Sequence, residues 1–109
     1  MNIQEVAAQT GWQIAVESQL NPKVEGVFVG DLLSWVMGHA QPGDLWVTVQ
    51  AHANIVAVAS LRELAGIVIA HGSEIEEETL QSAKDEGVMI LRTPQSAADC
   101  VKALATLGI

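Results

Sequence analysis

Aromatic residues and cysteine are scarce in this chain of 109 residues. Aromatics make up 4% of the sequence and there is one cysteine, whereas half of the residues are hydrophobic. The single cysteine, Cys100, excludes an internal disulfide and any thiolate metal site built within one chain. The core must therefore consist of Val, Ile, Leu and Ala, which is typical of buried parallel strands and the helices that cover them.

Basic residues are also few, with 5 Lys and Arg against 13 Asp and Glu and a formal net charge of -8. Because binding to nucleic acid or anionic lipid needs clustered Lys and Arg, this balance argues against both partners. No segment approaches the ~18 uninterrupted apolar residues of a membrane span. The N-terminus has Asn2, Gln4 and Glu5 where a leader would have basic and then apolar residues, so we expect a cytoplasmic protein.

The length suits one domain over residues 1–109. Short apolar runs predict five strands, at residues 12–16, 26–30, 45–49, 67–70 and 88–91. Helical patterns alternate with these runs, and each follows a residue that suits a helix N-cap: Asn2, Asp31, Asn54, Ser73 (in a capping box with Glu76) and Ser96. Strands separated by single helices predict an α/β fold with a mostly parallel sheet and helices on both faces.

Polar residues follow the predicted strands, at the edge where the carboxyl ends of parallel strands meet. Ligands gather at this edge in open α/β sheets, and helix N-termini there favour anions. The sequence therefore predicts a nucleotide or other phosphorylated metabolite as one candidate ligand, although no Gly-rich phosphate loop is present and Asp31 would repel an anion. The candidate ligand-binding residues are Asp31, Gln50, His52, Asn54, His71 and Thr93.

The sequence contains only weak indications of metal binding or catalysis. His39, His52 and His71 lie on separate segments without the i, i+4 spacing of a helical metal pair, so no metal site or cofactor is expected. Ser34, with His52 and Asp31, lacks the GxSxG context of a hydrolase nucleophile, and Cys100 is expected to be a buried helical residue. The sequence predicts no catalytic residue.

The predicted helix at residues 32–40 is apolar on nearly every side. A single sheet cannot cover such a helix in a small domain, and exposed apolar patches tend to mark association surfaces. Trp46, inside a predicted strand, is expected in the core, whereas Trp35 is the first choice as an interface anchor. These residues favour a homodimer whose candidate interface is Leu32, Trp35, Val36 and Met37.

Four segments of the chain together resemble the DRTGG domain family: VGDLLSWVMG, PGDLWVTVQAHANIVAVASL, GVMILRT and SAADC. The similarity is strongest to small stand-alone members encoded near iron-only hydrogenase genes, and the domain is also similar to the N-terminal domain of HPr kinase/phosphorylase. Residues 23–27 read KVEGV, which keeps Gly26 of the family signature and departs from it at Glu25 and Val27.

The resemblance implies a function without catalysis. It implies a regulatory or assembly module that acts by homodimerisation and by binding a protein partner in hydrogenase-linked redox metabolism. The alternative is a sensor of a nucleotide or phosphorylated metabolite at the carboxyl ends of the strands.

Overall fold

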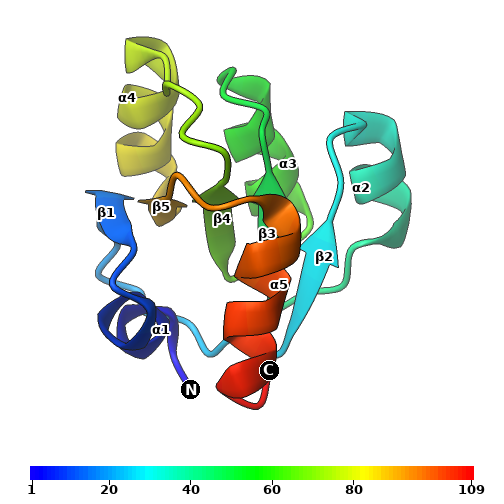
Figure 1. Ribbon diagram of the computed structural model, residues 1–109. Coiled ribbons are helices and arrows are strands. Elements are labelled where there is room, and N and C mark those ends of the chain that lie inside the picture. Colours follow the sequence, from blue (N-terminus) through cyan, green and yellow to red (C-terminus); the bar gives the residue numbers. More distant parts are fainter.

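A computed structural model describes residues 1–109 and ten elements in the predicted order (Figure 1). They are α1 (Ile3–Thr10), β1 (Gln13–Val16), β2 (Gly26–Val29), α2 (Leu33–His39), β3 (Asp44–Thr48), α3 (Asn54–Leu61), β4 (Gly66–Ile69), α4 (Glu77–Glu86), β5 (Ile90–Arg92) and α5 (Ala97–Thr106). The strands form one sheet in the order β1-β5-β4-β3-β2. Strands β2 to β5 are parallel, and β1 pairs antiparallel with β5. The predicted α/β fold with a mostly parallel sheet is confirmed.

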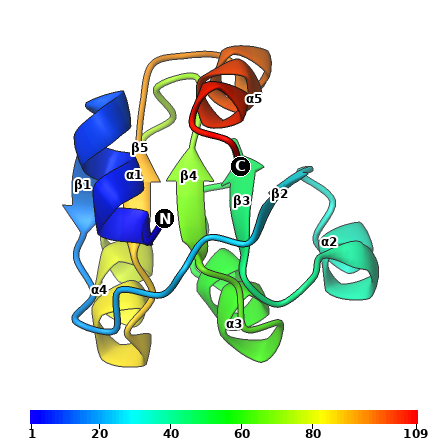
Figure 2. The ribbon, with the colours of Figure 1, turned by 90° about the horizontal axis from the view of Figure 1, so that it is seen from below.

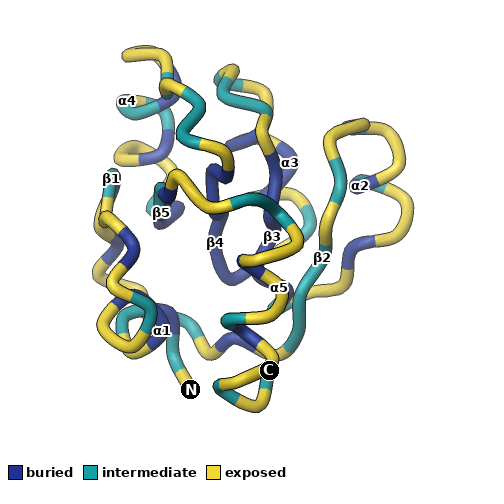
Figure 3. Tube along the Cα trace, in the orientation of Figure 1, coloured by how far each residue is buried: buried dark blue, intermediate teal, exposed yellow.

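Helices cover both faces of the sheet, as predicted. Helices α1 and α5 lie on one face, and α2, α3 and α4 lie on the other (Figures 1 and 2). Side chains of β3 alternate between the layers, because Leu45 and Val47 pack with the α1–α5 layer while Trp46 packs with the other. The central strands β3 and β4 are buried at every position, which explains the apolar residues from Leu45 to Val47 and from Ile67 to Ile69 (Figure 3).

Two of the five predicted helix caps are confirmed. The Asn2 side chain accepts a hydrogen bond from the Glu5 amide, and the Glu5 carboxylate accepts one from the Asn2 amide, which completes a capping box at α1. The Ser96 hydroxyl accepts from the Asp99 amide and so caps α5.

The other three predicted caps are wrong. Helix α2 begins after Leu32, and the Asp31 carboxylate accepts hydrogen bonds from β3 and the residue that follows it. Helix α3 begins at Asn54 itself, behind Ala53. Helix α4 begins only after Glu76, so Ser73 lies in the preceding turn, where its carbonyl accepts from Arg92. For Asp31 and Ser73, contacts with distant parts of the chain override the local capping signal.

The three tryptophans differ in environment. Trp46 is fully buried, as predicted, and its indole N–H donates to the Gly30 carbonyl. Trp12, for which the sequence makes no prediction, is buried and donates to the Gln95 side chain. Trp35 is exposed on α2 and stacks on the His39 ring, with ring centroids 3.8 Å apart.

The two termini lie near each other on the α1–α5 face of the sheet in both views (Figures 1 and 2). None of the helices has both the length and the apolar character needed to cross a bilayer.

Candidate functional site

The carboxyl edge of the parallel strands collects the six candidate ligand-binding residues. Asp31 follows β2, Gln50 and His52 follow β3, and Asn54 starts α3. His71 and Thr93 follow β4 and β5. Since these four strands are parallel, all six residues lie at the same edge of the sheet.

Asp31 ties the end of β2 to the end of β3. Its Oδ1 accepts a hydrogen bond of 2.8 Å from the Thr48 hydroxyl and one of 2.9 Å from the Val49 amide. The Gln50 side-chain amide donates back to the Asp31 carbonyl at 3.1 Å. These hydrogen bonds of Asp31 and Gln50 hold the chain segments after β2 and β3 together.

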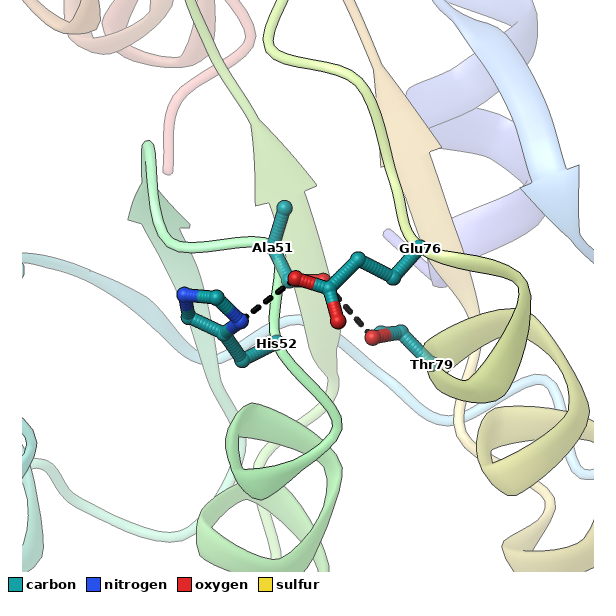
Figure 4. Close-up of polar contacts among 4 residues, drawn as sticks. All are labelled: Ala51, His52, Glu76 and Thr79. Carbon is teal, nitrogen blue, oxygen red and sulfur yellow. Dashed lines mark hydrogen bonds and ion pairs between the residues drawn. The ribbon is translucent and has the colours of Figure 1, made fainter.

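His52 joins the loop after β3 to the start of α4. Its Nδ1 lies 2.5 Å from the Glu76 carboxylate, and one turn further along α4 the buried Thr79 hydroxyl donates to the Ala51 carbonyl at 2.6 Å (Figure 4). Both contacts link the same two segments (Figure 4). The ion pair is exposed to solvent and the Thr79 hydrogen bond is not, so Thr79 is the stronger constraint on this loop.

His71 occupies the N-terminus of α5. Its backbone is left-handed, with a φ of +58°, and its Nε2 accepts a hydrogen bond of 3.2 Å from the Ala97 amide. The ring therefore takes up one of the free amides at this helix N-terminus that an anion would otherwise use. Thr93 is buried, and its hydroxyl accepts from the Gln95 amide.

Most surface pockets lie away from the candidate ligand-binding residues. Of the six candidate ligand-binding residues, Thr93 alone lines a hollow, one of about 350 Å³ at the β1 side of the edge. The residues that line it are Gly11, Trp12, Gln13, Gly72, Arg92, Thr93 and Pro94. The Arg92 guanidinium already donates to the Gly72 and Ser73 carbonyls. Polar groups converge at the carboxyl edge, but they chiefly bond to the protein itself.

Catalytic or metal-binding arrangements are not assembled. Ser34 makes no hydrogen bond with His52 or Asp31, whose side chains bond to other partners. No group of three or more His, Cys, Asp and Glu side chains is placed to hold a metal ion. Cys100 is fully buried in the core, as predicted, and this burial, with a smaller contribution from the Asp99 carboxylate, raises the pKa of its thiol to about 11.

A second candidate site is apolar and lies where β2 ends and α2 begins. The exposed fractions are 48% for Val29, 66% for Leu32 and 56% for Trp35. We call Val29, Leu32 and Trp35 the apolar edge surface. Sequence reasoning found Leu32 and Trp35 but missed Val29, because the buried pattern of strand 26–30 does not reveal that β2 is the last strand of the sheet.

Two residues of the predicted interface have other surroundings. Val36 is fully buried in the layer of α2, α3 and α4, so its place in the interface prediction is wrong. Met37 is half-buried and packs against the same layer. A seven-residue helix completes about two turns, so one of its sides must face the sheet even when every side is apolar.

The family model for the DRTGG domain matches residues 5–107. The chain belongs to the DRTGG domain family. Among solved structures, this DRTGG domain is similar to a crystal structure of the CBS and DRTGG domains of the regulatory region of Clostridium perfringens pyrophosphatase, complexed with the activator diadenosine tetraphosphate. The TM-score is 0.74 at 13% identity, over 94% of this chain and 45% of the other. A comparison with curated proteins finds no match.

The fold explains why Gly26 is kept from the family signature. It begins β2 beside Asp44, and a Cβ at this position would lie 2.8 Å from the Asp44 carboxylate oxygen. Asp44 is buried and accepts from the Gln41 amide, so it cannot easily move away. A glycine is therefore needed here for β2 to pair closely with β3.

Proposed function

We propose that this DRTGG domain is a non-catalytic regulatory or assembly module that acts by forming a homodimer and by binding a protein partner. The observation that carries the proposal is the apolar edge surface at the outermost strand. Burying a tryptophan removes about 150–250 Å² from water, and tryptophans are frequent anchors of interfaces. Trp35 and Leu32 are both more than half exposed, so this gain is unused in one subunit.

Sedimentation velocity over a concentration series tests the homodimer. We expect the wild-type protein to dimerise, and Trp35→Ala to weaken the dimer at least about 30-fold, which corresponds to the loss of a hot spot of about 2 kcal/mol. Leu61→Ala is the matched control, because Leu61 is 72% exposed on α3, away from the apolar edge surface. A wild-type monomer at high micromolar concentration would overturn the proposal.

A protein partner in a redox or hydrogenase system is proposed from the family resemblance. The same surface is the expected binding site, so purified iron-only hydrogenase should bind the wild-type protein more tightly than Trp35→Ala in surface plasmon resonance. Equal binding of the two proteins, or none, would contradict this assignment. The net charge of -8 supports a protein partner over nucleic acid or an anionic membrane.

Nucleotide sensing is the second candidate function, favoured by the activator bound to the pyrophosphatase region with the similar fold. Thermal-shift measurements with diadenosine tetraphosphate and with ATP test it. A ligand at a hundred times its dissociation constant stabilises the folded state by about 2.7 kcal/mol, which moves the melting midpoint by about 10 °C or more. An unchanged midpoint with both nucleotides at millimolar concentration would remove this candidate.

A further inference from the structure

Arg92, at the end of β5, has a guanidinium that is held in place but has no counter-ion. Its Nε donates to the Ser73 carbonyl at 2.9 Å, and its Nη2 donates to the Gly72 carbonyl at 2.7 Å. These two nitrogens form one edge of the planar group, so the end formed by Nη1 and Nη2 keeps two parallel N–H groups. Arg92 belongs to neither of the two ion pairs of the protein. Such a fixed fork fits a carboxylate, which accepts both hydrogen bonds at once.

The same side chain lines a hollow of about 300 Å³ beside β1 and α4, which pack together (Figure 1). This volume lies at the lower end of the range of about 300–1,000 Å³ that is typical of small-molecule sites. Much of the lining is apolar, with Ile14 and Ala15 from β1, Ile75 before α4 and Leu80 within it. Ile14 is 43% exposed, so an apolar group placed here would remove its surface from water.

Glu74 gives the hollow a second charge, opposite in sign to that of Arg92. Its side chain is exposed and forms no ion pair with Arg92. A ligand that has a carboxylate and an ammonium group a few atoms apart can therefore pair with both residues. A phosphate would pair with Arg92 but would be repelled by Glu74.

We infer that this hollow binds a free α-amino acid with an aliphatic side chain. The ligand carboxylate accepts from the free end of Arg92, the ammonium group pairs with Glu74, and the side chain packs among the apolar residues of the lining. The site lies at the β1 end of the sheet, opposite β2, so it is separate from the apolar edge surface and from the proposed homodimer.

An NMR titration of the wild-type protein with L-leucine tests the site. We expect saturable shifts that are largest at the amides of residues 13–15, 73–75 and 92. L-Leucinamide lacks the carboxylate and N-acetyl-L-leucine lacks the ammonium group, so each should bind at least about 10-fold more weakly than leucine. Glycine lacks the aliphatic side chain and should also bind at least about 10-fold more weakly.

Two variants separate the roles of the charges. Glu74→Gln should weaken leucine binding about 10-fold and leave N-acetyl-L-leucine binding unchanged, because the acetylated ligand has no ammonium group. Arg92→Lys keeps the positive charge but loses the fork, so it should weaken the binding of both ligands. Glu78→Gln is the matched control, since Glu78 is exposed on α4 and does not line the hollow, and it should bind leucine like the wild type.

The ligand series and Glu74→Gln decide the inference even if Arg92→Lys does not fold. An unchanged spectrum at millimolar leucine, or shifts confined to other parts of the molecule, would overturn the site. Equal binding of leucine and N-acetyl-L-leucine would overturn the free amino acid as the ligand and would assign the hollow to the C-terminal residue of a peptide. A wild-type monomer would overturn the homodimer alone, because no residue of this hollow belongs to the apolar edge surface.

Discussion

The two edges of the sheet are built differently. At β1 the pairing with β5 is antiparallel and shifts register between Ile14 and Val16, whereas β2 pairs with β3 without interruption. Polar Gln13 begins β1 and acidic Glu17 follows it, while Glu25 precedes β2, so neither strand contains a charged residue. Irregular pairing is a common means of protecting an edge strand from association. The difference teaches that β1 is the closed edge of this domain and β2 the open one.

Neighbouring elements strengthen the contrast. Strand β1 packs against α4, and Ile14 lies in a hollow of about 300 Å³ with Ile75 and Leu80 from the α4 segment. After β1 the Ser18 hydroxyl donates to the Gly87 carbonyl, which fixes the chain beneath that edge. At β2 the apolar edge surface has no such cover.

The largest expected effect comes from removing the core beneath the open edge. Trp46→Ala should lower the free energy of unfolding by about 3–5 kcal/mol, because it opens a cavity and leaves the Gly30 carbonyl without its donor. Chemical denaturation with urea measures this loss. Trp35→Ala is the comparison, since an exposed tryptophan should change the stability of the monomer by less than about 0.5 kcal/mol. If both variants lost the same free energy of unfolding, Trp35 would contribute to the core of the monomer and would not be a free surface residue.

A charge on each edge compares them directly. Val29→Lys should weaken the dimer by about 30-fold or more, because it buries a lysine without a partner at the interface. Ile14→Lys adds the same charge to the closed edge, where the side chain is 43% exposed, and should leave the dimer intact. Analytical ultracentrifugation of both variants decides the matter, and the reverse order of effects would assign the interface to β1.

The side chains at the carboxyl ends of the parallel strands are expected to stabilise the fold and not to take part in association. Thr79→Ala leaves the carbonyl of half-buried Ala51 without its donor and should cost about 1–3 kcal/mol of stability. Thr79→Ser keeps the hydroxyl and should recover most of this loss. Both variants should dimerise like the wild type in light scattering, whereas a changed dimer would connect this edge to the interface.

The smallest effect at neutral pH is expected at Cys100. Burial and then Asp99 raise the pKa of its thiol from 9.0 to about 11, so the folded protein holds the proton more tightly than the unfolded chain does. Stability should therefore fall as the pH rises from about 9 to about 11, and Cys100→Ala should lack this dependence. The thiol should also resist labelling at pH 8 in the native state. Rapid labelling there would contradict the burial.

The fold is largely predictable from local patterns, whereas the site is not. Continuous runs rich in β-branched residues, such as residues 45–49 and 67–70, predict buried strands, because such strands face a helix layer on each side. The order of the strands depends on contacts far apart in sequence, so neither the antiparallel β1 nor the edge position of β2 follows from these runs. Since Asp31 bonds to Thr48, 17 residues away, its cap-like position is misleading.

The same reasoning accounts for the candidate ligand residues. Their position after the strands is predictable, because each follows the end of an apolar run. Their hydrogen bonds within the protein are not predictable, because they join distant residues: His71 accepts a hydrogen bond from the Ala97 amide, 26 residues away. Val36 shows the limit for α2: composition indicates that the helix has too much apolar surface, but only packing shows which residues face the sheet.

The closeness of the two termini bears on how such a domain combines with others. Because both ends leave from the same face, the fold can be inserted into a loop of a host protein with little disturbance of the host. Such an insertion would leave β1 and β2 at the outer rims of the sheet. Insertion into a host and the proposed pairing of subunits would then use separate parts of one small fold.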